Sequence, residues 1–147
     1  MLNPLLIKEG AENFGSQCIV VAVDSRNVNG VDKVFTHGGR KETEWTVLDW
    51  CRRAEELGAG EILLTSWDKD GTKSGFDCAQ LAEITSAVNI PVIASGGGGT
   101  MQHFVDAALI GHASAVLAAS VFHFGQIDIM DLKRYMHDKG VPVRLDV

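Results

Sequence analysis

Four consecutive glycines at positions 96–99 follow the apolar segment 92–95 and precede Thr100. Glycine adopts positive φ angles without strain and lets backbone N–H groups come close to a ligand, so such a run at a strand end can cradle an anion. Thr100 is a suitable N-cap for a helix after the run, whose first amides and dipole would also attract phosphate. The pattern predicts a phosphate site at this glycine run, with a flexible turn as the alternative interpretation.

Polar residues also stand at the ends of the other apolar runs. Asp24 directly follows the apolar run 18–23, which is a costly position for a carboxylate unless its charge is paired or used. We expect Asp24 to act as a catalytic acid or base, and an N-cap or loop hydrogen bond is the alternative. Thr65 ends a second run, and Ala119 and Ser120 end a segment of small residues. The carboxyl ends of parallel strands carry the sites of α/β folds, so we expect these residues at one edge.

The loop 66–75 is rich in aspartate, lysine and glycine. Its alternating carboxylates resemble a calcium loop, but Lys69 and Lys73 interrupt them and the final glutamate of such a loop is missing, so no calcium site is predicted. Asp70 is instead a candidate general acid or base, and Thr65 would orient a substrate oxygen. A solvated turn is the alternative interpretation of this loop.

The composition argues against several classes of partner and cofactor. The chain has 147 residues, is 46% hydrophobic and carries a formal net charge of −6, without a basic cluster for nucleic acid or an anionic membrane. Its three cysteines and five histidines show no disulfide, metal or triad spacing, so we expect no metal and no cofactor. There is no signal peptide and no apolar run that approaches a membrane span of about 20 residues, which favours the reducing cytoplasm.

Helical and strand patterns alternate along the chain. Apolar residues recur at helical spacing or form short β-branched runs, separated by glycines or by N-cap residues such as Asp77. The predicted helices cover residues 3–14, 47–57, 77–88, 101–110 and 128–139, with one helical turn at 121–124, and the predicted strands cover 18–23, 61–65, 92–95 and 114–119. The segment 26–42 predicts a small hairpin after the first strand.

Four βα units with one helix in front predict an α/β fold with a parallel sheet, in a single domain over residues 1–147. A closed eight-stranded barrel needs about 250 residues, so the chain forms either half of a TIM-type barrel or a small doubly wound domain. All four strand ends carry polar residues, as a common rim requires, and this favours the half barrel.

Several long segments carry a resemblance to a known family. They are residues 13–24, 58–66, 68–75, 93–97 and 117–123. In this order they closely resemble the cyclase subunit of imidazole glycerol phosphate synthase, an enzyme of histidine biosynthesis. The resemblance covers nearly the whole chain but only the second half of the family's βα barrel, from its fourth helix to its eighth strand and helix. It therefore implies a fragment or truncation of a longer barrel.

The resemblance implies a reaction and its acid/base group. The family combines ammonia from a glutaminase partner with the ribulosyl aminoimidazole carboxamide nucleotide, and forms imidazole glycerol phosphate and aminoimidazole carboxamide ribotide. Two aspartates act there as acid and base. Asp24 matches the one at the end of the fifth strand, whereas the other belongs to the first half of the barrel.

The resemblance also implies binding residues. One of the two substrate phosphates is held in the family by the loops after the seventh and eighth strands, and these match Gly97, Gly98, Ala119 and Ser120. Gly98 stands where the family usually has alanine. Thr65 and Asp70 match positions that contact the substrate, and Gln17 and Glu61 match the opposite face, where the glutaminase docks and ammonia enters.

Two alternatives stand beside the cyclase-derived half barrel: a non-catalytic phosphate-binding scaffold, and the sister isomerase of the same pathway, which shares the barrel and the phosphate loops. The loop 68–75 and the segment 119–123 favour the cyclase. A half barrel leaves apolar strand faces uncovered, so a second copy, as a homodimer, or an N-terminal half barrel is expected to complete it. The residues expected to face that interior are Val20, Ala22, Leu63 and Val92.

Overall fold

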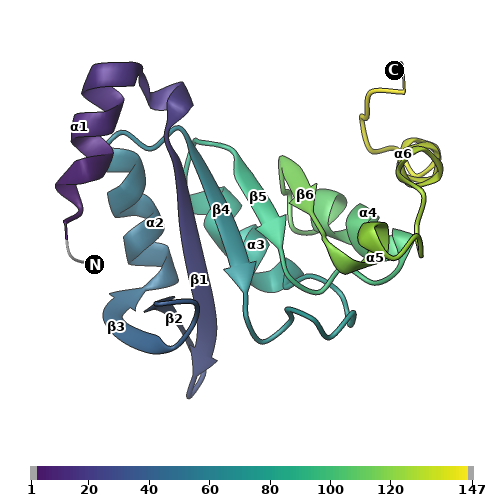
Figure 1. Ribbon diagram of the computed structural model, residues 1–147, viewed down its shortest axis with the longest axis horizontal. Coiled ribbons are helices and arrows are strands. Elements are labelled where there is room, and N and C mark those ends of the chain that lie inside the picture. Colours follow the sequence, from purple (N-terminus) through teal and green to yellow (C-terminus); the bar gives the residue numbers. More distant parts are fainter. Residues whose placement is uncertain (1–2, 146–147) are drawn as a thin grey trace.

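The computed structural model describes residues 3–145, and its central feature is a six-stranded sheet (Figure 1). The strands are β1 (Val20–Val28), β2 (Val31–Thr36), β3 (Lys41–Thr46), β4 (Glu61–Ser66), β5 (Val92–Ser95) and β6 (Ala115–Leu117). The helices are α1 (Leu5–Phe14), the 3-10 helix η1 (Ser16–Cys18), α2 (Val47–Glu56), α3 (Cys78–Ala87), α4 (Met101–Leu109), α5 (Ser120–His123) and α6 (Ile129–Asp138).

Four of the strands form the parallel part of the sheet. The strand order is β3-β2-β1-β4-β5-β6, in which β1, β4, β5 and β6 are parallel to their neighbours in this set. Helices follow these strands along the chain, as the predicted βα units require. The fold is therefore α/β with the arrangement of a partial TIM-type barrel, which confirms the predicted fold class.

The predicted hairpin is present as β2 and β3, which extend the sheet beside the second half of β1. Its turn has Asn29 and Gly30 at φ 52° and 86°, the left-handed pair that a type I′ turn requires. Pairing with β2 from Asp24 onward carries β1 to Val28, well beyond the predicted end.

Two predicted strands also have wrong boundaries next to helical turns. The first strand begins at Val20 rather than at residue 18, because Ser16–Cys18 closes into η1. The last strand covers Ala115–Leu117 rather than 114–119, because Ala119 already has helical backbone angles as the N-cap of α5. Both errors lie where an apolar run continues into a helical turn, and hydrophobicity alone does not mark that change.

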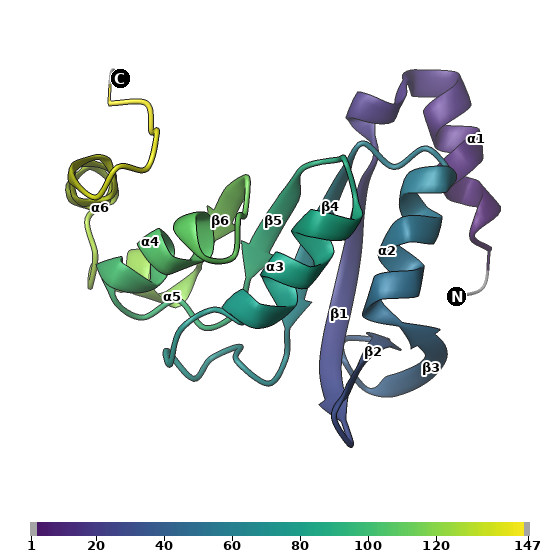
Figure 2. The same cartoon turned by 180° about the vertical axis from the view of Figure 1, so that it is seen from behind.

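One face of the parallel strands is covered by α2, α3 and α4, which lie in front of the sheet in Figure 2. Alternate strand residues point into this layer, and Val23, Leu64 and Ala94 are at most 2% exposed. Trp50 from α2 and Phe104 from α4 fill the space between sheet and helices. This packed layer holds the strand ends in place.

The opposite face of the parallel strands has no helix over it in the described part of the chain (Figure 1). The register defines two rows across this face: Ala22, Leu63, Ile93 and Ala115, then Asp24, Thr65, Ser95 and Leu117. Such rows correspond to the inner layers of a TIM barrel. The expectation for Val92 was wrong, because it pairs with the buried Ile62 and is itself 1% exposed, and Ile93 takes its place.

The first helix lies near the amino ends of the strands and is poorly covered. Gly58, in the connection before β4, leaves room for the Ala11 side chain of α1. Leu6 and Phe14 are 62% and 70% exposed, so much of the apolar face of α1 has no partner within residues 3–145. No helix among these residues combines the length and apolar character that crossing a membrane requires.

Candidate functional site

A pocket of about 220 Å³ lies at the carboxyl ends of β5 and β6. It is lined by Asp70, Gly71, Lys73, Ser95, Gly96, Gly97, Gly98, Leu117, Ala118, Ala119 and Ser120. The lining combines the loop after β4, the glycine run after β5 and the segment that follows β6. Five of the residues predicted to bind substrate or phosphate thus meet in one concavity.

The pocket is rich in backbone donors that the protein leaves free. Within residues 3–145, the N–H groups of Gly97, Gly98, Ala119 and Ser120 have no hydrogen-bond acceptor. Unpaired amides around a small concavity are suited to the oxygens of a phosphate group, since an anion can accept from several of them at once. These are the four residues that the sequence analysis assigned to phosphate.

The next two N–H groups, those of Gly99 and Thr100, already have an acceptor. Thr100 is the N-cap of α4, as predicted, and His103 lies one turn further along the helix. The Nδ1 atom of His103 accepts from the N–H groups of Gly99 at 3.2 Å and Thr100 at 3.3 Å. These two bonds fix where the glycine run enters α4. The sequence alone did not indicate this role, because histidine is an unusual residue for a capping side chain.

The glycines also have a packing role. An added Cβ on Gly96 would lie 2.6 Å from the carbonyl oxygen of Ser66, and on Gly97 it would collide with the carbonyl of Gly75. Both residues have positive φ, 92° and 107°. The loop after β4 therefore lies directly on the glycine run, and only glycine allows that approach.

Two of the residues that line the pocket, Asp70 and Lys73, have charged side chains. Lys73 donates to Oε1 of Gln126 at 2.8 Å, which links the loop after β4 to the turn after α5. Asp70 is exposed, and its backbone N–H donates to the carbonyl of Ser66 at 2.8 Å. The loop 66–75 is thus folded over the pocket rather than being a free solvated turn.

Asp24 lies on the uncovered face, in the row nearest the pocket. It pairs in register with Thr65, and Thr65 pairs with Ser95, which lines the pocket. Asp24 is half-buried, and its side chain makes no hydrogen bond or ion pair with any residue from 3 to 145. Its carboxylate is therefore unpaired within the described residues, on the face next to the pocket.

A buried polar contact supports this row from behind. Ser25, which is 0% exposed, has its Oγ 3.1 Å from the carbonyl oxygen of Thr65 and 2.9 Å from Oε1 of Gln80. Gln80 comes from α3 and is 4% exposed. The contact ties the strands that carry Asp24 and Thr65 to the helix layer. Sequence reasoning missed it, although the alternation Val21, Val23, Ser25 points Ser25 inward.

A protein-family model described as "Histidine biosynthesis protein" matches residues 1–128 of the chain. The chain belongs to this family. The matched range contains Asp24, the loop after β4, the glycine run and α5, and it ends at the N-cap of α6. Every residue that lines the pocket of about 220 Å³ therefore lies inside the family match.

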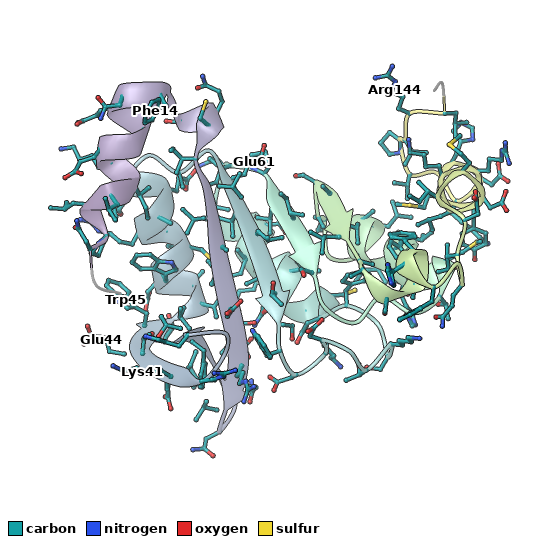
Figure 3. All side chains as sticks on the ribbon, in the orientation of Figure 1. Phe14, Lys41, Glu44, Trp45, Glu61 and Arg144 are labelled. Carbon is teal, nitrogen blue, oxygen red and sulfur yellow. The ribbon has the colours of Figure 1, made fainter. Side chains whose placement is uncertain are left out.

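Two further predicted residues of this histidine biosynthesis protein lie at the opposite edge of the sheet. Gln17 is an exposed residue of η1. Glu61 is the first residue of β4 and is labelled in Figure 3. The N–H groups of Gly60 and Glu61 both donate to the carbonyl of Ile19, at 2.9 and 3.2 Å, which holds η1 against the start of β4. The two residues are thus on one edge, away from the pocket, where the resemblance puts a partner.

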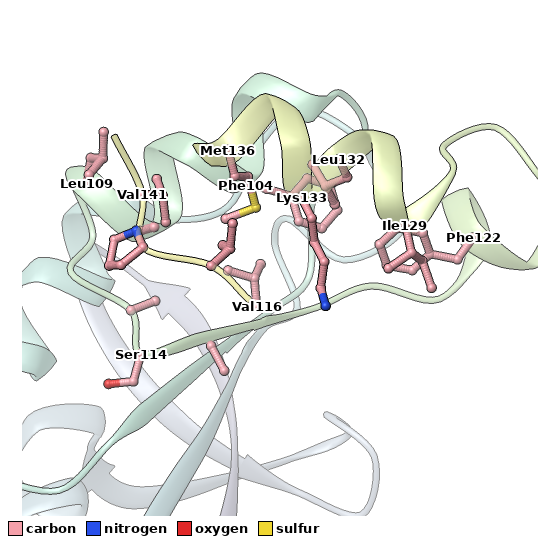
Figure 4. A pocket seen from close by; sticks show the side chains of 15 residues that line it. Phe104, Leu109, Ser114, Val116, Phe122, Ile129, Leu132, Lys133, Met136 and Val141 are labelled. Atoms are coloured by element: carbon pink, nitrogen blue, oxygen red, sulfur yellow. The ribbon is translucent and has the colours of Figure 1, made fainter. Parts of the chain in front are cut away.

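A second cavity in the histidine biosynthesis protein, of about 510 Å³, lies between α4, β6 and α6 (Figure 4). Phe104, Val116, Leu132 and Met136 line it, together with other apolar side chains, and Lys133 is its charged residue. An apolar lining of this kind offers few donors for a phosphate. The smaller pocket is therefore the candidate substrate site.

Proposed function

We propose that this chain is the phosphate-binding, acid/base half of a cyclase of the imidazole glycerol phosphate synthase type. The observation that carries the proposal is the group of free N–H donors of Gly97, Gly98, Ala119 and Ser120 around one pocket. A phosphate of the ribulosyl aminoimidazole carboxamide nucleotide would be anchored there. The rest of the substrate would then extend over the uncovered face.

The proposed chemistry uses the row next to the pocket. Asp24 has an unpaired carboxylate that can take or give a proton during ring closure and cleavage, and the Thr65 hydroxyl beside it can orient a substrate oxygen. Asp70 lines the same pocket and would contact the substrate near its phosphate. A second acid/base residue, the first phosphate site and the remaining wall would come from a completing half barrel, and ammonia would enter from the edge with Gln17 and Glu61.

Two other functions use the same pocket. The sister isomerase would bind a similar phosphate, but the folded loop 68–75 over the pocket and the segment 119–123 favour the cyclase. A non-catalytic phosphate-binding scaffold would need the amides and not Asp24. The three functions can be distinguished by whether they consume ammonia and whether they need the Asp24 carboxylate.

The test combines calorimetry with turnover. Inorganic phosphate is titrated into the wild-type chain and into Asp24→Asn, and both are assayed with the ribulosyl nucleotide and ammonium salts, alone and with a cyclase N-terminal half barrel. The cyclase proposal expects equal phosphate affinity for both chains and ammonia-dependent product from the wild type alone. Isomerisation without ammonia consumption supports the isomerase, and equal inactivity with intact phosphate binding supports the scaffold. Absence of phosphate binding contradicts all three.

A further inference from the structure

One basic residue lines the pocket, Lys73, and the proposed function gives it no role. We propose that the Lys73 ammonium group binds the substrate phosphate and that Gln126 is the positioning residue that holds it there. The inference rests on the proposed phosphate site. It adds a charge-recognising residue to a pocket otherwise built from neutral amides and one carboxylate.

The backbone of Lys73 is fixed against the glycine run. Lys73 has φ 56°, a left-handed conformation that is uncommon for a residue other than glycine. An added Cβ on Gly99 would lie 2.6 Å from the Lys73 Cβ and would collide with its carbonyl oxygen. Thr72 braces the loop from inside, since its hydroxyl donates to the Lys69 carbonyl at 2.6 Å. The Lys73 side chain therefore starts from a defined point at the pocket wall.

The ammonium group of Lys73 keeps free donors. Its bond to Oε1 of Gln126, 2.8 Å long, uses one of three N–H donors and leaves two for a ligand. No carboxylate among residues 3–145 lies within ion-pair distance of Lys73. Gln126 is neutral, so it orients the ammonium group without cancelling its charge. The charge is then available to an anion in the pocket.

The charge balance of the pocket gives Lys73 a reason to be there. A phosphate dianion bound to the free amides would share the pocket with the Asp70 carboxylate. Neutral amides supply hydrogen bonds but no net charge, so they would not offset the electrostatic repulsion between the phosphate and the Asp70 carboxylate. A hydrogen-bonded lysine offsets it, and charge-assisted bonds to phosphate are stronger than neutral ones. Lys73 would thus make the site prefer a dianion over a neutral group of the same size.

Lys69 provides a matched control in the same loop. It has the same charge and lies four positions earlier, but it does not line the pocket. Replacing either lysine by methionine removes one positive charge from the loop and keeps a side chain of similar length. A difference between the two variants therefore measures contact with phosphate rather than the overall charge of the protein.

The test is calorimetric titration of inorganic phosphate into the wild type and five variants, with urea unfolding of each as a check that it is folded. The variants are Lys73→Met, Lys73→Arg, Lys69→Met, Gln126→Leu and the double variant Lys73→Met/Gln126→Leu. Loss of a charged hydrogen bond predicts that Lys73→Met weakens phosphate binding about 10- to 100-fold. We expect Lys73→Arg to keep most of the affinity. Lys69→Met should change it less than about threefold, because Lys69 is half-buried and does not line the pocket. Gln126→Leu should weaken binding by a smaller factor, and the double variant should bind no more weakly than Lys73→Met, because the glutamine acts through the lysine.

The outcomes separate this inference from the proposed function. One outcome is that the wild type binds phosphate and Lys73→Met binds it equally well, or loses only as much affinity as Lys69→Met. In that case Lys73 does not bind phosphate, but the phosphate site proposed for the pocket remains valid. Additive losses in the double variant overturn the positioning role of Gln126. A wild type that binds no phosphate overturns the inference and the proposed function together.

Discussion

The backbone N–H of Gly75 donates to the carbonyl of Gly97 at 2.9 Å, so the loop after β4 and the glycine run after β5 are joined by their main chains. The two segments are separated in sequence by helix α3 and strand β5. Their contact brings Asp70 and Lys73 to the same pocket as Gly97 and Gly98. The glycine run therefore has two roles in the pocket. It supplies free N–H donors, and it holds the loop after β4, which forms the opposite wall.

This contact predicts a large stability loss for Gly97→Ala. The added Cβ collides with the Gly75 carbonyl, and φ at position 97 is 107°. Gly30→Ala is the matched control, because Gly30 also has positive φ, 86°, but no atom within 4 Å of the added Cβ. The control should lose about 1–2 kcal/mol from backbone strain alone, and Gly97→Ala at least about 1–3 kcal/mol more from overpacking. Urea unfolding measures both, and equal losses would contradict the collision.

The buried contact between Ser25 and Gln80 predicts a coupling free energy. Ser25→Ala removes the only hydrogen-bond partner of the Gln80 side-chain oxygen in the described chain, and a buried polar group left unpaired costs about 1–3 kcal/mol. Gln80→Leu alone leaves the Ser25 hydroxyl its bond to the Thr65 carbonyl. We expect the double variant to be less destabilised than the sum of the single variants. Strict additivity in urea unfolding would show that the two side chains do not support each other.

The Cys51 thiol predicts a stability loss at alkaline pH. Cys51 is 0% exposed, and burial raises its pKa from 9.0 to about 12. The unfolded chain releases this proton first, so the stability from the raised pKa is complete below pH 9.0 and is lost as the pH rises toward about 12. The slope for one proton is about 1.4 kcal/mol per pH unit.

Comparison with Cys51→Ala isolates this effect from other alkaline titrations. Burial also raises the pKa of Cys78, with further contributions from the charges of Asp106 and Asp77, but that group is the same in both chains. The difference in unfolding free energy between the two chains should be constant below pH 9 and shrink above it. A difference that is independent of pH up to 11 would contradict the buried-thiol interpretation.

The sequence was informative where a property lies within one short segment. Apolar runs that end in Asp24, Thr65 or the glycine run could be recognised directly, because strand and turn chemistry are local. His103, Lys73 and Gln126 could not be assigned, since their roles depend on contacts between segments that are distant in sequence. The error at Val92 has the same origin: alternation within a strand is visible, but the face it selects is set by hydrogen-bonded register with the neighbouring strand.

The uncovered face predicts association of two copies of this chain. Leu63 and Ile93 lie on it beside Ala22, and Val20 and Leu117 at its margins are 50% and 44% exposed. The outer edges of the parallel strands are also open, along the whole of β6 and along the first part of β1. Within residues 3–145, β6 has no strand beyond it, and β2 pairs with β1 only from Asp24 onward. Open edges and apolar rows of this kind favour pairing with another sheet.

A twofold arrangement satisfies both edges at once. The β6 edge of each copy would pair with the free first part of β1 in the other, which closes eight parallel strands into a barrel with isologous contacts. The exposed Leu6 and Phe14 of α1 would come to the seam, beside the apolar cavity between α4, β6 and α6. Each uncovered row would then be buried in a common core, and the two copies of Asp24 would lie at the same end of the barrel.

Sedimentation equilibrium at micromolar concentration tests this assembly. We expect a species of twice the chain mass of 15.8 kDa for the wild type. Leu63→Lys should yield monomers, because an unpaired charge in an apolar barrel interior costs several kcal/mol, whereas on the open face of a monomer it remains in water. Ile110→Lys is the control, since Ile110 is an exposed apolar residue, 58% accessible, after α4 and outside both rows. It should leave the dimer intact. A folded wild-type chain that stays at the monomer mass as its concentration rises would exclude the closed barrel.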